Sequence, residues 1–171
     1  MCSLKNAKQP TSSQAIGLSI AIQNASSDPD IPTDIQLTQW AIKALDTRSE
    51  QAEITIRIVD PTEGATLNAQ YRHKENGPTN VLSFSYTPPM GMEALLLGDI
   101  VICAAVVATE AQDQQKPLEA HWAHMVVHGV LHLLGYDHEQ VSDALIMEAL
   151  ENTILKALDF EPPYGEPLIN E

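Results

Sequence analysis

The sequence predicts a single α+β domain with a mixed sheet, because strand-like and helix-like segments are distributed unevenly along it. Alternating apolar residues, typical of strands, occur only in the first 105 residues, whereas each later segment up to about Leu158 favours a helix. A chain of 171 residues, 44% of them apolar, is long enough to bury one core. We therefore expect one domain over residues 15–160, between a flexible tail at residues 1–14 and an irregular tail at residues 161–171.

Four segments carry the strand pattern. In the first, apolar residues such as Leu18 and Ile20 alternate with small ones, and in the second Ile54, Ile56 and Ile58 alternate with polar residues. The expected strands cover residues 17–22, 53–58, 81–86 and 97–103.

Helices are predicted between and after these strands. Thr33 can cap a helix whose apolar residues recur at helical spacing as far as Leu45. A short helix should run from Glu63 to about Arg72, after a start signal that includes Pro61. The remaining helices are expected at residues 104–115, 117–134 and 141–158, the second of which carries most of the histidines.

The chain is acidic, with 9 Lys and Arg against 23 Asp and Glu and a net charge of −14. Residues 91–171 contain only Lys116 and Lys156 against 14 acidic residues, so an anion-binding surface must use the first half. This balance argues against tight nonspecific binding to nucleic acid, DNA included, because such binding depends on many contacts between cations and phosphates. With no bilayer-length apolar run, no secretory signal and no disulfide pattern, we expect a cytoplasmic protein with reduced thiols and no membrane partner.

The chemistry-bearing residues are concentrated in one helix and the turn after it. His128 and His132 are four residues apart, which places both imidazoles on one helix face. Gly135 can end the helix in a left-handed turn that returns His138 to the same ion. Three neutral nitrogens suit Zn²⁺ or a neighbouring metal such as nickel, and leave a coordination position open.

Neighbouring residues have less specific roles. His124 lies one turn before His128. It could hydrogen-bond and orient a metal ligand, act as a base, or be an ordinary half-buried histidine of the helix. Asp137 could orient a ligand imidazole, act on the metal water, or only cap the turn. We expect His121 to be exposed.

The same histidine spacing occurs in zinc peptidases, where a Glu follows the first His as general base. Here Gly129 stands at that position, which argues against a peptidase mechanism. Met147 could suggest the methionine turn of such enzymes, but it is surrounded by apolar residues, and we expect it in a helix core.

Residues 128–138, which read HGVLHLLGYDH, resemble the signature of the YbeY family of bacterial metal-dependent endoribonucleases. Residues 67–72, 79–84 and 97–102 resemble further family segments, and the similarity runs from about Leu18 to Leu158. Ser85 stands where the family usually has Pro, a departure that leaves the motif intact.

The resemblance implies zinc at His128, His132 and His138, and a catalytic role for His128 and Arg72. An arginine is planar, always charged and able to bind phosphate through two hydrogen bonds. Lys74 and Arg57, with His73, could extend a short substrate-binding strip beside Arg72. The general base is not assigned, and its two candidates are Asp137 and a hydroxide generated at the metal.

On this basis we expect an endonuclease specific for single-stranded RNA, acting on ribosomal RNA precursors and in ribosome assembly or quality control. Its expected partners are the small ribosomal subunit and assembly proteins. Two alternatives remain at this point: a zinc peptidase, and a non-catalytic zinc protein that assists ribosome assembly. Structural zinc sites are usually closed by four ligands, often cysteines, which argues against the second alternative.

Overall fold

The structure is a computed structural model that describes residues 17–45, 50–72 and 77–164. The expected flexible tail at residues 1–14 lies outside the described residues, as do residues 165–171 of the expected C-terminal tail. Within the described part of the chain, no helix is both long enough and apolar enough to cross a bilayer.

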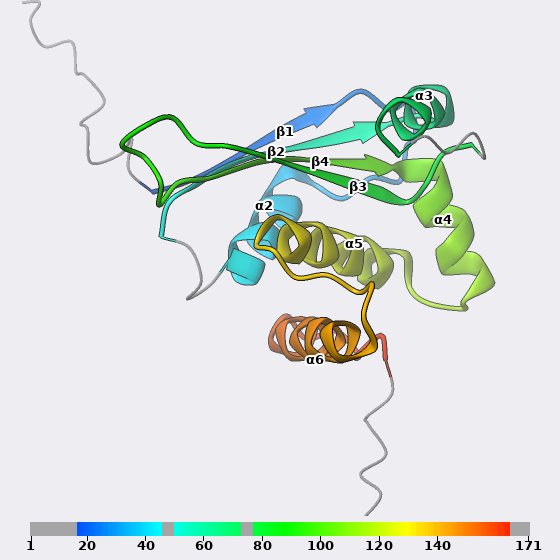
Figure 1. Cartoon of the computed structure of the whole chain (residues 1–171). Helices are drawn as coiled ribbons and strands as arrows, with labels where there is room; N and C mark the ends of the chain where they lie inside the picture. Colours follow the sequence, from blue (N-terminus) through cyan, green and yellow to red (C-terminus); the bar gives the residue numbers. More distant parts are fainter. Residues whose placement is uncertain (1–16, 46–49, 73–76, 165–171) are drawn as a thin grey trace, which may run out of the picture.

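A four-stranded sheet forms one layer of the molecule (Figure 1). Its strands lie in the order β1-β2-β4-β3, in which β1, β2 and β4 run parallel and β3 runs antiparallel to β4. The predicted α+β class with a mixed sheet is therefore confirmed. The strands are β1 (Leu18–Asn24), β2 (Ala52–Val59), β3 (Val81–Tyr86) and β4 (Leu96–Cys103).

Helices pack on both faces of the sheet, unequally. Figure 1 shows α3 on one face, α2 and α5 on the other, and α6 beyond α5 as a further layer. The helices are α2 (Asp34–Leu45), α3 (Pro61–Arg72), α4 (Ala104–Asp113), α5 (Leu118–Leu133) and α6 (Val141–Ala157).

Local sequence accounts for these elements. Thr33 and Gln36 form reciprocal hydrogen bonds at the start of α2, because the Gln36 amide donates to Thr33 Oγ1 and the Thr33 amide donates to Gln36 Oε1. In β2, Ile54, Ile56 and Ile58 are buried as their alternation predicts.

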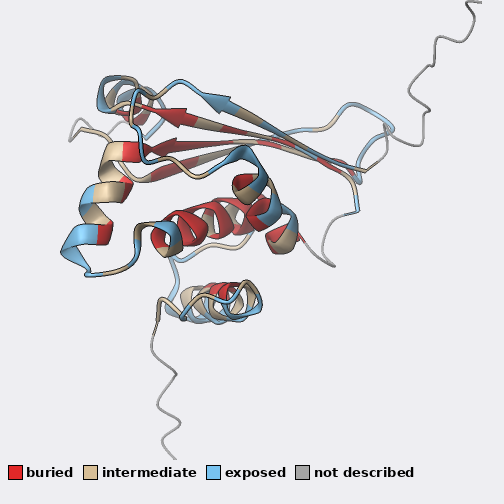
Figure 2. Ribbon diagram, turned by 180° about the vertical axis from the view of Figure 1, so that it is seen from behind, coloured by how far each residue is buried: buried red, intermediate tan, exposed pale blue. Residues whose placement is uncertain are grey.

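Helix α5 is the centre of the core. It is covered by the sheet on one side and by α6 on the other, and most of its residues are buried (Figure 2). Met147 of α6 is 1% exposed, so its expected place in a helix core is confirmed. Cys103, at the end of β4, is a buried free thiol. A helix fixed on two sides is a rigid support for the side chains that project from its last turns.

Candidate metal centre

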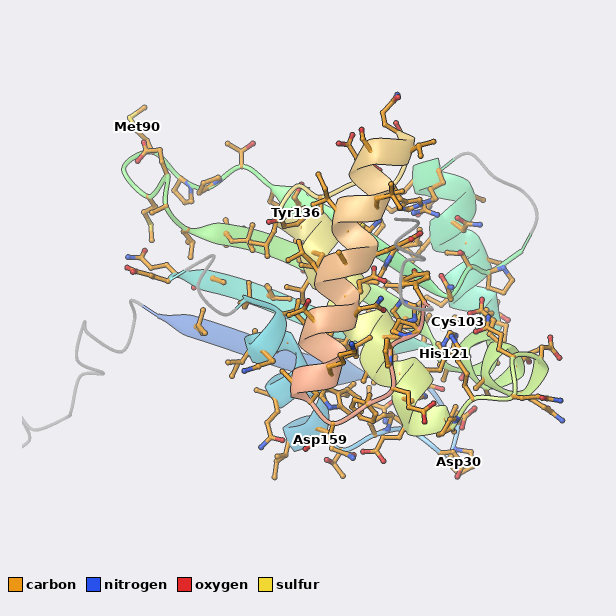
Figure 3. All side chains as sticks on the ribbon, turned by 90° about the horizontal axis from the view of Figure 1, so that it is seen from below. Asp30, Met90, Cys103, His121, Tyr136 and Asp159 are labelled. Carbon is orange, nitrogen blue, oxygen red and sulfur yellow. The ribbon has the colours of Figure 1, made fainter. Side chains whose placement is uncertain are left out.

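The last two turns of α5 present His128 and His132 side by side, with ring centroids 4.7 Å apart. Both side chains are half-buried. Figure 3, viewed from below the sheet, shows α6 lying over α5 on the side away from the strands. The two imidazoles are therefore carried by backbone that cannot shift without repacking the core.

Gly135 reverses the chain after α5. Its φ of 100° lies in the left-handed region, as expected for a glycine that ends a helix. The Tyr136 amide donates to the Leu131 carbonyl at 3.0 Å, which closes the turn. His138 returns to the helix end, with ring centroids 5.5 Å from His128 and 5.1 Å from His132. One nitrogen of each imidazole lies within 4.8 Å of the others, so this group can hold a metal ion.

The three histidines share a cavity of about 240 Å³ with the end of α3 and the start of β3. Arg72, His132 and His138 also line a second, wider hollow of about 540 Å³. Its remaining lining residues belong to the turn after α5. The first cavity is lined by Arg72, Asn80, Val81, Ser83, His128, His132 and His138.

His132 fits the role of a metal ligand. Its Nε2 atom is buried and has no hydrogen-bond partner, an arrangement that costs free energy unless another group uses the lone pair. Burial, followed by the neighbouring His128 and His138, lowers the pKa of His132 to about 4. At neutral pH the imidazole is therefore uncharged, which is the form that binds a metal.

Glu151 of α6, which our sequence analysis did not single out, meets two of the histidines. Its carboxylate accepts hydrogen bonds from His124 Nε2 at 2.7 Å and from His128 Nδ1 at 2.5 Å, and the residue is 1% exposed. Burial opposes its ionisation, but the hydrogen bonds and the electrostatic attraction of His124 and His128 together outweigh burial and lower the pKa to about 2. The signal was visible in the sequence, because Glu151 stands in the apolar stripe of α6 between Met147 and Leu155.

His124 is buried and faces Glu151, with the Tyr164 hydroxyl 3.4 Å from its Nε2. His121 is also buried, at 2% exposure, so our prediction that it is exposed was wrong. The reason is α4, which places Glu110 2.8 Å from His121 Nε2 at the start of α5. Burial lowers the pKa of His121 and outweighs the opposing effect of Glu110.

Of the residues expected to form a basic substrate-binding strip, Arg72 lies at the three-histidine cavity and Arg57 does not. Arg72, exposed at the end of α3, lines both hollows. Arg57 lies elsewhere on β2, where it donates to Glu63 at 2.8 Å and to Gln23 at 3.2 Å, and it lines neither hollow. Lys74 and His73 lie outside the described residues. Among the described lysines and arginines, Arg72 alone lines the three-histidine cavity.

Asp137 lines the wider hollow, and its carboxylate accepts a hydrogen bond from the His138 amide at 2.7 Å. This contact is the capping interaction that was one of its expected roles. Gly129 packs against β4: a Cβ atom there would lie 2.9 Å from Cγ2 of Ile100. A glutamate at position 129 would therefore be forced against the sheet.

Comparisons with known proteins identify the family of the chain and a similar fold. Residues 21–159, most of the chain, match the family described as Endoribonuclease YbeY. The fold is similar to the solution structure of TM1509 from Thermotoga maritima, described as a NESGC target protein. That similarity has a TM-score of 0.54, covers 89% of this chain and 99% of that chain, and is accompanied by 21% sequence identity. At this level of identity it concerns the fold alone.

Proposed function

Because this chain belongs to the YbeY family of endoribonucleases, we propose that it hydrolyses phosphodiester bonds of single-stranded RNA in the three-histidine cavity. Its substrates would be ribosomal RNA precursors in the cytoplasm, as our sequence analysis expected. One observation carries the proposal: Arg72 and a group of imidazoles able to hold a metal ion line the same cavity.

In this proposal His128, His132 and His138 hold one divalent ion. When bound, the ion would polarise a phosphoryl oxygen and lower the pKa of a water molecule. Three nitrogen ligands suit zinc, and nickel is a further candidate. The buried, unpartnered Nε2 of His132 supports the assignment, because a metal would satisfy that atom.

Arg72 would bind the scissile phosphate. Its guanidinium can donate two parallel hydrogen bonds to phosphate oxygens, and its charge offsets the negative charge that grows on them as water attacks phosphorus. Its exposed position at the rim of the cavity, at the end of α3, lets it reach a substrate without moving the core.

Asp137 is our candidate for the group that accepts the proton from the attacking water, since it lines the wider hollow together with Arg72. The His138 amide occupies one lone pair of its Oδ1 atom, which leaves acceptor capacity on the carboxylate. His124 is a weaker candidate for this base, because its Nε2 is engaged by Glu151.

We further propose that the small ribosomal subunit or an assembly protein supplies much of the affinity for RNA. The chain carries a net charge of −14, and the half that contains the histidines is its more acidic half. A single arginine at the cavity would offset only a small part of the charge of even a short RNA.

A peptidase is the less favoured function. A zinc peptidase of this spacing requires a glutamate after the first histidine, and the packing of Gly129 against Ile100 gives that side chain no space. A non-catalytic zinc protein would have no need of an arginine in the metal cavity.

A substrate comparison tests the proposal. Metal-loaded protein is incubated, with and without ribosomal subunits, with a labelled single-stranded RNA, with the same RNA annealed to its complement, and with an unfolded protein. We expect cleavage of the single strand, much slower cleavage of the duplex and none of the protein. Cleavage of the protein, or no cleavage of either RNA in the presence of ribosomal subunits, would refute the proposal.

A further inference from the structure

Glu151 is a carboxylate in the interior of the protein. It is 1% exposed, and it stands on α6 between Met147 and Leu155, which are equally buried. Burying a carboxylate is costly unless it is fully hydrogen-bonded, and an apolar side chain would fill this position at lower cost. Its place between two histidines therefore calls for an explanation beyond packing.

The hydrogen bonds of Glu151 determine which nitrogen of His128 carries a proton. An ionised carboxylate only accepts hydrogen bonds, so His128 must donate from Nδ1, which lies 2.5 Å from Oε1. A neutral imidazole with its proton on Nδ1 has a free lone pair on Nε2. His128 lines the three-histidine cavity, and Nε2 is the nitrogen that Glu151 leaves available to it.

The second carboxylate oxygen is occupied in the same way. His124 Nε2 lies 2.7 Å from Oε2, and His124 is itself buried. With both oxygens engaged from α5, the carboxylate cannot rotate away from His128. His124 therefore acts as the anchor of Glu151.

His124, His128 and Glu151 also form a group whose ligand atoms lie close enough to hold an ion. The distances argue against that use. Two ligands of one tetrahedral zinc ion, each about 2.1 Å from it, lie roughly 3.4 Å apart. The separations of 2.5 and 2.7 Å in this group are those of hydrogen bonds.

We infer that Glu151 is a positioning residue that holds His128 in the tautomer and orientation required for metal binding, with His124 as its anchor. This inference rests on the metal site of the proposed function. It assigns a role to α6, which contributes no residue to the lining of the three-histidine cavity. Carboxylates that orient ligand histidines typically increase metal affinity by about 10- to 100-fold.

The variant Glu151→Gln tests the inference, because its amide replaces one of the two acceptor oxygens with an NH₂ group, which cannot accept a hydrogen bond from a histidine N–H. We expect the dissociation constant for Zn²⁺ to rise about 10- to 100-fold. Glu148→Gln, one turn earlier on α6, removes the same charge and should bind Zn²⁺ as the wild type does. Wild-type affinity in a folded Glu151→Gln protein would overturn the inference.

A second measurement needs neither metal nor a variant. In the metal-free wild type, the ¹⁵N chemical shifts of His128 should report a protonated Nδ1 and an unprotonated Nε2. The opposite tautomer would overturn the inference, even if Glu151→Gln failed to fold. So would a loss of metal affinity in Glu151→Gln with an unchanged His128 tautomer, because the carboxylate would then act through its charge alone.

These readouts separate the inference from the proposed function. If the wild type bound no metal, the proposed site would fail while the tautomer measurement still tested Glu151. If Glu151→Gln bound metal normally and RNA were cleaved, only the inference would fail.

Discussion

Arg72 owes its proposed role to its shape as well as its charge. Among the described lysines and arginines it is the one that lines the three-histidine cavity, and it stands exposed at the end of α3. An ammonium group at this place would supply the same charge without the planar pair of donors that matches phosphate.

Replacing Arg72 with Lys should therefore lower RNA turnover by about 100-fold, because the hydrogen bonds to the phosphate are lost in the transition state. The free energy of unfolding should change by less than about 0.5 kcal/mol, since the side chain is exposed. Single-turnover cleavage rates, thermal melting and metal content check these expectations. Arg57→Lys, at a position outside both hollows, is the matched control. Normal cleavage by Arg72→Lys would disprove the phosphate contact.

At the scale of the elements, the metal centre depends on how α5 ends. His128 and His132 are set by helical spacing, but His138 reaches them only because the chain turns at Gly135 with a φ of 100°. A side chain at this position would be strained even though there is open space around it.

We predict that Gly135→Ala destabilises the protein by about 1–2 kcal/mol and weakens metal binding, because the turn that carries His138 must relax. Gly91→Ala is the matched control, since Gly91 has a φ of 88° and equally open surroundings in the loop between β3 and β4. It should show a similar loss of stability with wild-type metal affinity. Denaturant melts and zinc titrations of both variants provide the comparison. Equal metal affinities would show that the turn does not hold His138.

The elements themselves were largely predictable, because periodicity and capping are local. The expected strand at residues 81–86 matches β3, and the other strands and the helices differ from expectation by a few residues at their ends. The spacing of the three histidines likewise predicted the group that the structure brings together.

What the sequence did not predict depends on contacts between distant elements. The burial of His121 requires α4 to lie beside the start of α5, and the hydrogen bonds of Glu151 require α6 to cross the back of α5. Arg57 was expected beside Arg72, but its side chain pairs with Glu63 and lines neither hollow. The hydrophobic periodicity of one helix or strand does not predict which residues of other elements its polar side chains will contact.

At the scale of the whole molecule, the net charge of −14 restricts how RNA can be bound. We predict weak binding to naked single-stranded RNA through two or three phosphate contacts, which gives a slope of log affinity against log salt of about −1.4 to −2.1. Fluorescence anisotropy with a labelled oligonucleotide at several salt concentrations measures the slope. A slope that indicates eight or more contacts, or equal affinity for duplex RNA, would contradict a local site.

Acid should destabilise the metal-free protein, beginning below about pH 6.5. Folding lowers the pKa of both His121 and His132, and that of His132 is about 4. Below pH 6.5, until the pH reaches the folded-state pKa of each residue, the unfolded chain therefore binds more protons than the native one. The stability that these residues contribute is present above pH 6.5 and is lost as the pH falls. Urea melts at pH 7, 6 and 5, in salt that screens the surface carboxylates, should show falling midpoints. A constant midpoint would contradict the burial of neutral histidines.

The central claim is that one metal ion, held by three histidines beside Arg72, supports cleavage of RNA. Its most direct test is to add Zn²⁺ in steps to metal-free protein and to record the initial rate of cleavage of a labelled single-stranded RNA, with ribosomal subunits present. The rate should rise from near zero to a plateau at one equivalent per chain, and His132→Ala should stay near zero at that ratio. Full activity in protein shown to contain no metal, or a plateau reached only at two equivalents, would contradict the claim.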